Sequence, residues 1–479
     1  MRKAPVLIAA VVLSASSAAF SLVWMAAQTP PPQAPEVLPP LKANPLPGSA
    51  GAPSVGQAPA TTPPATTPPA GTPPQPIVPA AGQKSGQEPG LLLPMPKLNA
   101  LPVNNNEAAV DLSKMPPLAR QMYMAATRGA EWLARVQLPN GKFLGGWYPA
   151  VWAPLDEDVF TRQASAAFAL ARAAKYLKNE SYAARARQAV LCLRDETTLD
   201  PQTKQRYTLQ PPLAVNRLSS AGLLLACIHE LPNPAAELIE QGEELAAYIR
   251  SQQQSDGSIV LASITRPEGE NITLHPGVAL HGIAASMSAR PAPWKPELLH
   301  KAMGFYRKQF KANPDLTLAI WQGLAYSEAY LATKDPAFAE YVFELCDWVC
   351  ALQYDRLDPR QPHWLGGFAD SAAGKRQSNP PTINSAAVAE LIGAACRVTR
   401  QRPDAQRYDQ YLAVLSRALQ FVTSLQYTED TSQHFATTYR PTILGGFHLS
   451  HQNGTLRLDY QRHAVSALVQ FLSGIADRI

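Results

Sequence analysis

Ile443-Leu-Gly-Gly-Phe447 is one of three copies of a short pattern in which a large apolar residue precedes Leu-Gly-Gly and an aromatic residue. The other copies are Phe143-Leu-Gly-Gly-Trp147 and Trp364-Leu-Gly-Gly-Phe368. Upstream of each copy, a helix-like segment carries an aromatic residue at a fixed spacing before a glutamine. A fourth such segment runs from Tyr248 to Gln253. Self-similarity of this kind indicates stacked copies of one supersecondary unit, so the sequence predicts a repeat architecture.

Apolar residues recur at three- and four-residue steps from residue 117 almost to the end of the chain, which predicts helices. We expect twelve, at 117–137, 160–177, 181–196, 215–230, 235–253, 276–289, 296–311, 317–333, 336–353, 382–399, 404–426 and 460–476. The odd-numbered helices are amphipathic, whereas the even-numbered ones are small and apolar on nearly every side. A helix that is apolar all round is normally buried. The alternation predicts an all-α fold, a single (α/α)6 toroid of six outer and six inner helices.

Two segments carry a family resemblance. Gln137-x-x-x-Gly141-x-Phe143 and Gln253-x-x-x-Gly257-x-Ile259 are similar to degenerate copies of the glutamine/tryptophan repeat of terpene cyclases. From about residue 117 to 479 the chain thus resembles the α/α-toroid superfamily, which includes terpene cyclases, protein prenyltransferases, polysaccharide lyases and glycoside hydrolases. The resemblance implies the fold and leaves the reaction open, because function belongs to sites rather than to folds.

The N-terminus predicts export. Met1-Arg2-Lys3 precedes Ala4–Ala27, which carries no charge, and a basic start with an apolar run is typical of a signal peptide. At about 24 residues the run is also long enough to cross a bilayer uncleaved. We therefore expect residues 1–28 to be a signal peptide or an N-terminal membrane anchor. The protein would then be periplasmic or extracellular, attached to the membrane through residues 4–27 if they are retained.

The rest of the chain divides by composition. Residues 29–104 are rich in Pro, Ala and Thr and predict a disordered linker, which leaves 105–479 for the toroid. The net charge of +5 is not gathered into basic blocks, so we expect no nucleic-acid partner. The five cysteines have apolar helical neighbours and are expected to be packed thiols. Cys346 and Cys350 lie one turn apart without a Cys-x-x-Cys motif or a nearby histidine, and the sequence predicts no metal or cofactor.

The resemblance to toroids implies a ligand cavity at one end of the inner ring, where the inner helices begin. A gapless alignment of the first and third copies on their Gly-Gly pairs places Arg162 on Arg462 and Gln163 on His463. Asp459 lies four residues before His463, so the two would share a helix face as the orienter and the general base. Alternatively, Asp459 only caps the helix and His463 is a structural histidine beside it.

Further candidates precede other inner helices. Asp158 follows Asp156 and Glu157 just before the first inner helix, where it would meet Asp459 across a seam as an acid/base couple for glycoside cleavage. The alternative is that these acids only complement the positive end of a helix. His275 opens the third inner helix as a second candidate acid, or as a structural histidine. The residues expected to hold substrate are Arg217, Arg462, Tyr460, Trp321, Asn384 and His448.

These features favour an exported toroid that acts on a carbohydrate, an acidic or cell-surface polysaccharide or oligosaccharide, by lysis, hydrolysis or epimerisation. Two alternatives remain open at this level. One is a terpene cyclase-like or prenyltransferase-like enzyme, although the acid motif Asp-x-Asp-Asp of protonating cyclases is missing because Val159 follows Asp158. The other is a non-catalytic binding or assembly module on a tether.

Overall fold

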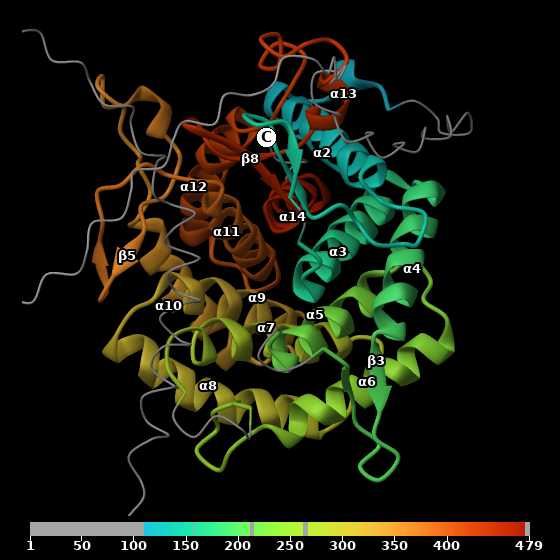
Figure 1. The fold of residues 1–479 in the computed structure, drawn as a ribbon. Coiled ribbons are helices and arrows are strands. Elements are labelled where there is room, and N and C mark those ends of the chain that lie inside the picture. Colours follow the sequence, from blue (N-terminus) through green and yellow to red (C-terminus); the bar gives the residue numbers. More distant parts are fainter. Residues whose placement is uncertain (1–109, 156, 211–214, 262–266, 475–479) are drawn as a thin grey trace, which may run out of the picture. The chain divides into compact units, whose positions relative to one another are not determined.

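Two concentric rings of helices make up the described part of the chain (Figure 1). The outer helices are α2 (Pro117–Arg135), α4 (Glu180–Asp195), α6 (Ala236–Ser251), α8 (Trp294–Ala312), α10 (Pro336–Cys350) and α12 (Ala405–Ser424). The inner helices are α3 (Phe160–Leu177), α5 (Arg217–Glu230), α7 (Leu274–Ser286), α9 (Leu316–Thr333), α11 (Asn384–Gln401) and α14 (Leu458–Gly474). Each inner helix packs against its two inner neighbours, and α14 packs against α3 to close the ring. The predicted (α/α)6 toroid is confirmed.

The computed structural model describes residues 110–474 apart from 156, 211–214 and 262–266. All of them belong to the unit Gln87–Ile479. The expected signal or anchor segment and the expected linker, residues 1–104, lie outside the described residues. Among the described residues, no helix combines the length and the apolarity needed to cross a membrane.

Small residues bring the inner helices close together, as the sequence predicts. Nearly every residue of α5 and α7 is buried. A Cβ atom added to Gly222 would lie 2.5 Å from the carbonyl oxygen of Val278, and one added to Gly282 would lie 2.4 Å from that of Gly222. Because such contacts are too short for a methyl group, the crossing of these two helices requires glycine on both sides.

The connections differ in length at the two ends of the rings. Only residues 178–179 join α3 to α4, and only 334–335 join α9 to α10. Such short links make consecutive helices antiparallel, so the inner helices all begin at the same end. The long connections lie at that end, and we call it the loop face. The short elements within these connections are α13 (Arg440–Ile443) and η2 (Gly269–Asn271), with η3 (Pro362–Trp364) in the connection before α11.

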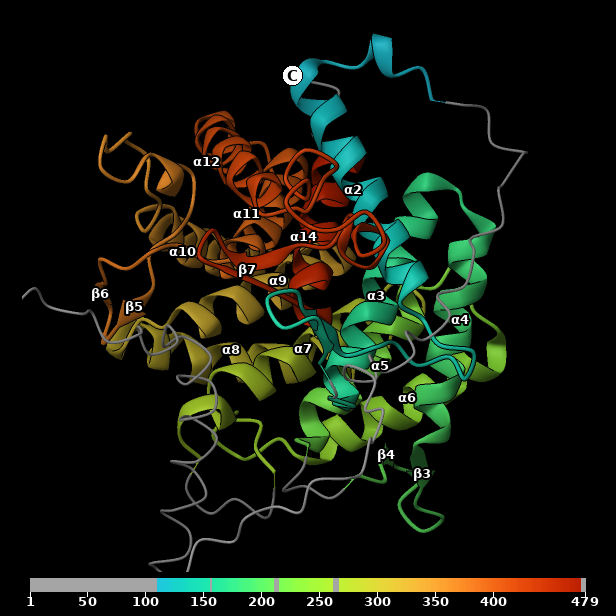
Figure 2. The same ribbon diagram turned by 45° about the horizontal axis from the view of Figure 1, so that its top comes forward.

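A small sheet on the loop face joins the two ends of the toroid. Its strand order is β2-β1-β8-β7. The strands are β1 (Gly146–Tyr148), β2 (Ala153–Pro154), β7 (His448–Ser450) and β8 (Asn453–Arg457). Strand β1 pairs antiparallel with β8. In Figure 2, β7 is seen beside α14. Two further hairpins, β3 (Thr197–Leu199) with β4 (Arg206–Thr208) and β5 (Ser371–Ala372) with β6 (Lys375–Arg376), lie in other loops.

A glutamine clamp links neighbouring outer helices at the repeat sites. Gln426, just after α12, donates from Nε2 to the carbonyl oxygen of Gly445 and to that of Ala125 in α2, each at 2.9 Å. One side chain thus ties the end of an outer helix to a turn and to the next outer helix. The same pair of bonds runs from Gln137 to Gly141 and Arg185, from Gln253 to Gly257 and Leu298, and from Gln353 to Gly366 and Val414.

The glycine of each clamp is required by its backbone. Gly445 has a φ of +87°, and an added Cβ would lie 2.2 Å from the carbonyl oxygen of Arg128. Gly141, Gly257 and Gly366 also have positive φ, at +91°, +93° and +87°. Glycine adopts this region without the steric penalty of other residues. The recurring unit is therefore glutamine, then glycine, then an apolar residue two positions later.

The position of this unit shows that the first copy of the repeat was aligned wrongly with the third. The clamp there uses Gly141, and the Leu-Gly-Gly run that ends at Gly146 lies further along the chain. Gln163 bonds both the N–H and the carbonyl of Phe143, and Gln461 bonds those of Phe447 in the same way. Gln163 therefore corresponds to Gln461, and the gapless alignment with His463 is wrong. Phe143 and Gln163 are 20 residues apart, whereas Phe447 and Gln461 are only 14 apart, so an alignment without gaps cannot match both the turns and the helices.

The cysteines follow the expectation of packed thiols. All five are free; Cys227, Cys346, Cys350 and Cys396 are buried, and Cys192 is partly exposed. Burial raises the pKa of the Cys227 and Cys396 thiols. These thiols are therefore protonated and unreactive at neutral pH.

Replacing the clamp glutamine tests its role. Gln426→Ala removes two buried hydrogen bonds, one to Ala125 of α2 and one to Gly445, and leaves the carbonyl of Gly445 without this partner. We expect it to lower the free energy of unfolding by about 2–4 kcal/mol, because each unsatisfied buried group costs roughly 1–3 kcal/mol. Urea denaturation followed by circular dichroism measures the loss. Gln254→Ala, at an exposed site beside another clamp, is the control, and equal stability of the two variants would refute the clamp.

Candidate functional site

A network of buried charges lies inside the inner ring. Glu390 of α11 is fully buried, and its carboxylate accepts from Arg462 Nη1 at 3.2 Å and from Arg172 Nη1 at 3.3 Å. Arg172 of α3 also bonds Glu230 at the end of α5, at 2.9 Å. Two guanidinium groups and two carboxylates thus neutralise one another across four inner helices. Removing one member would leave an uncompensated buried charge, which is strongly destabilising.

His463 completes the network. Its Nδ1 lies 2.8 Å from Glu390 Oε2. Burial by itself would raise the pKa of Glu390, but Arg462, His463 and Arg172 outweigh it and hold that pKa at about 2. Glu390 is therefore ionised and can only accept, so a hydrogen bond between these two groups requires the hydrogen on Nδ1. Arg462 Nη1, which can only donate, also lies 2.9 Å from Nδ1 and 3.3 Å from Nε2. Burial and the nearby Arg462 lower the pKa of His463. The imidazole is consequently neutral at pH 7, and with the hydrogen on Nδ1 its lone pair is on Nε2.

Aromatic rings surround Arg462 and His463. The Arg462 guanidinium lies between Trp321, at 4.6 Å, and Phe168, at 5.0 Å. The ring of His463 lies edge-on to Trp321 at 5.6 Å, and His281 lies 6.0 Å from the same indole. Glu390 and Arg462 have no exposed side-chain surface, whereas 17% of the His463 side chain is exposed. Of these three groups, the imidazole is the one that can meet a ligand.

The structure replaces the expected orienter of His463. Asp459 is held by Arg457, through bonds of 3.0 and 2.5 Å, and Arg162 Nε lies 4.0 Å from it. The guanidinium of Arg457 also lies 4.6 Å from the ring centre of Tyr460. Glu390, on a different helix, takes the place that the sequence assigned to Asp459. The four-residue spacing between Asp459 and His463 suggested the wrong partner, because Arg457 binds the Asp459 carboxylate instead.

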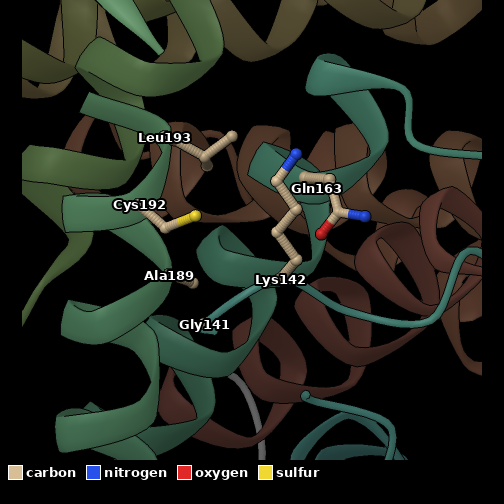
Figure 3. Close-up of a pocket in the computed structure, with 6 residues that line it drawn as sticks. All are labelled: Gly141, Lys142, Gln163, Ala189, Cys192 and Leu193. Atoms are coloured by element: carbon tan, nitrogen blue, oxygen red, sulfur yellow. The ribbon is translucent and has the colours of Figure 1, made fainter. Parts of the chain in front are cut away.

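Asp158 lies in a separate ion-pair cluster. It pairs with Lys142, whose Nζ is also 2.5 Å from Glu196 after α4. Lys142 lines a small surface pocket together with Gly141, Gln163, Ala189, Cys192 and Leu193. Figure 3 shows Lys142 and Gln163 on one side of it and the α4 residues on the other. Asp158 is half exposed beside this outer seam, and the structure does not pair it with Asp459 as an acid/base couple.

The candidates on α5 and α7 lie at the start of their helices. His275 Nδ1 lies 3.0 Å from Ser219 Oγ, and its Nε2 lies 3.7 Å from the Glu270 carboxylate. Burial lowers the pKa of His275 to about 4, so this imidazole is also neutral at pH 7. Arg217 lies 4.6 Å over the ring of Tyr207. Both side chains are partly buried near the loop face, as the sequence predicts for the ends of inner helices.

The last two candidates, Asn384 and His448, also lie near the loop face. Asn384 begins α11, and its backbone N–H bonds Thr382 Oγ1 at 3.3 Å. His448 lies in β7 with Nδ1 2.9 Å from the carbonyl oxygen of Ser450, and burial lowers its pKa to about 4. Its ring lies 4.8 Å from that of Tyr427. These contacts account for His448 as part of the loop-face packing.

Sequence reasoning missed Glu390 and Arg172. A signal was present, because each charge lies among small apolar residues in a helix that was expected to be buried. Acidic and basic side chains are almost never fully buried unless paired. Their partners could not be read from the sequence, since Glu390 lies 72 residues from Arg462 and 218 from Arg172.

Comparison with known proteins identifies the fold. No protein-family model matches the chain, and no curated protein matches its sequence. A sugar epimerase from a ruminal bacterium is similar in structure, with a TM-score of 0.55 and 10% identity over 75% of this chain and 99% of that one. D-mannose isomerase gives a TM-score of 0.54 and 12% identity, covering 76% and 100% of the two chains.

A third similar structure is an unsaturated glucuronyl hydrolase specific for heparin, with a TM-score of 0.50 and 13% identity over 74% of this chain and 97% of that one. At such low identity the likeness concerns the fold alone. The chain has the (α/α)6 toroid fold.

The buried histidines predict a pH dependence of stability. Burial lowers the pKa of His275 and His281 to about 4, against about 6.5 in the unfolded chain. Between these values the unfolded state binds protons that the folded state does not, so stability is full above pH 6.5 and falls towards pH 4. Urea midpoints between pH 4.5 and 7.5 should show this slope, and His281→Leu should flatten it. The exposed His300→Gln is the control; an unchanged slope in His281→Leu would contradict the assignment.

Proposed function

We propose that this chain is an exported carbohydrate-acting enzyme in which His463 removes a proton from a carbon next to a sugar carbonyl or carboxyl group. The observation that carries the proposal is the bond between His463 Nδ1 and the ionised Glu390, at 2.8 Å. Export is inferred from the basic start and apolar run of residues 1–28. The reaction class is epimerisation or isomerisation, with lysis as the variant for a uronate.

The surroundings of His463 suit a hydroxyl-rich ligand. The charged Arg462 side chain lies between two aromatic rings, those of Phe168 and Trp321. Carbohydrate sites combine aromatic faces with a few polar groups that fix orientation. The toroids of similar structure include a D-mannose isomerase and a sugar epimerase, which is compatible with the proposal and does not carry it.

The proposed reaction gives a role to His463 and to Glu390. Nε2 of His463 accepts the proton, and the bonding electrons move to the substrate oxygen to give an enolate. Glu390 holds the ring through Nδ1–H and stabilises the imidazolium that forms. Arg462 disfavours the imidazolium and so promotes return of the proton. Delivery of a proton from solvent to the opposite face of the enolate gives the epimer, and His463 then releases its own proton to solvent. His275 and His281 of α7 are neutral at pH 7 and do not supply this proton. Loss of the oxygen substituent at the next carbon gives the lyase product.

The other reaction classes receive less support. Hydrolysis needs two cooperating carboxylates, and Asp158 and Asp459 are engaged by different cations. A terpenoid cyclase needs an apolar cavity, whereas Arg172, Arg462 and Glu390 occupy the interior of this ring. A binding module without catalysis is the second candidate, because Glu390 and Arg462 are closed off from solvent. The experiment below distinguishes it from an enzyme.

Hydrogen exchange tests the proposal. The protein is incubated in D2O with mannose, cellobiose, polygalacturonate and an unsaturated heparin disaccharide, and loss of carbon-bound hydrogen is followed by NMR. We expect exchange in at least one sugar. His463→Gln should slow it by about 10²–10⁴-fold, the usual contribution of a general base.

The matched control is His300→Gln. His300 Nε2 lies 2.8 Å from Asp335 on the outer ring. The His300→Gln variant therefore removes a histidine–carboxylate pair of the same length at an exposed site. Its exchange rate should equal that of the wild type. Exchange in none of the sugars, or an undiminished rate in a folded His463→Gln protein, would overturn the proposed function.

A further inference from the structure

An aromatic shelf lies on the loop face beside the entrance to α14. We use this name for Tyr148, Trp152, Phe435 and Tyr439. Trp152 stacks on Tyr439 with ring centres 4.1 Å apart and lies 6.2 Å from Phe435. Tyr148 and Trp152 flank the turn between β1 and β2, and the other two rings come from the connection between α12 and α13. Two segments from opposite ends of the toroid therefore build one surface.

The shelf is built rigidly and is partly exposed. Trp152, Phe435 and Tyr439 are partly buried, and Trp152 also lies edge-on to the buried Trp147 at 5.2 Å. Trp152 has a φ of +49°, which is a strained backbone for a bulky residue. Such strain persists only where the surroundings impose it, and it concentrates at ligand sites. Arg440 holds the second segment through bonds to the carbonyls of Phe435, at 3.1 Å, and Gln433, at 2.9 Å. Tyr148 is 40% exposed and Val151, at the tip of the turn, is 73% exposed.

Charged groups that compensate one another border the shelf. Arg457 pairs with Asp459, and Arg162 pairs with Glu157. Tyr148 is close enough to act electrostatically on both arginines. The side chains of Asp459 and Glu157 are 31% and 40% exposed. The border thus offers hydrogen-bond donors and acceptors without net charge.

The shelf is placed to receive the part of a ligand that extends from His463. Strand β1 pairs with β8, which runs directly into α14. His463 lies five residues into that helix from Leu458, about 8 Å along its axis at 1.5 Å per residue. A single sugar ring is too short to contact both His463 and the shelf, whereas two or three linked rings are long enough.

We propose that the aromatic shelf binds a neutral sugar unit of an oligosaccharide whose reacting unit lies at His463. The weakly positive C–H face of a pyranose complements the negative face of an aromatic ring, and the balanced border matches hydroxyl groups rather than a charged unit. The proposal rests on the proposed function for the choice of a sugar. The substrate is then an oligosaccharide or a polysaccharide end rather than a monosaccharide.

Binding to an array of neutral and uronate-containing glycans of one to six units tests the shelf without catalysis. We expect the wild type to bind neutral glycans of two or more units. Trp152→Gly removes the ring and relieves the positive φ, so it should fold while weakening binding by about tenfold or more. Tyr148→Ala, at an exposed position, should weaken it in the same direction. Trp294→Ala, which removes a partly exposed indole of an outer helix, is the matched control and should bind as the wild type does.

The outcomes separate this proposal from the proposed function. Binding that survives in His463→Gln but is lost in Trp152→Gly supports the shelf, even if no sugar exchanges hydrogen. Exchange in a monosaccharide with no effect of Trp152→Gly on any glycan would overturn the shelf and leave the proposed function standing. No binding to any glycan, or equal binding to single sugars and longer chains, would also overturn the shelf.

Discussion

The glutamine clamp is the interaction on which the toroid depends. Each clamp joins an outer helix, a glycine turn and the next outer helix through one side-chain amide. The clamp at Gln426 reaches α2 and so closes the ring between the two ends of the chain. The turn also begins the path to an inner helix, because Gln461 of α14 bonds both backbone groups of Phe447. The clamp therefore fixes where α14, and with it His463, begins.

Charge neutrality inside the ring is the second constraint. Buried ion pairs seldom add much net stability, because desolvation offsets their attraction. Their effect here is geometric: Glu390 can satisfy Arg172, Arg462 and His463 only when α3, α11 and α14 are correctly placed. The same bonds fix the tautomer and orientation of the imidazole. The placement of these helices and the proposed proton chemistry thus depend on one carboxylate.

The candidate site and the repeat occupy different parts of the same connection. The glycine turn supports the scaffold, whereas the residues after it differ from copy to copy. After the last copy they form β7 and β8, which carry Arg457 to Asp459 and bring β1 alongside. The sequence drew attention to this segment through His448, Asp459 and His463. Of these, the structure connects His463 to the interior and Asp459 to the border of the aromatic shelf.

The sequence by itself determined the toroid, the alternation of outer and inner helices and the packed cysteines. These follow from local periodicity and from how apolar each helix is, and both can be read along the chain. Only the tertiary structure decided the partners. Glu390 bonds His463 across 73 residues, and Trp152 stacks on Tyr439 from the other end of the chain. Because ring closure sets such distances, spacing along one helix could suggest Asp459 as the partner of His463 but could not reveal Glu390.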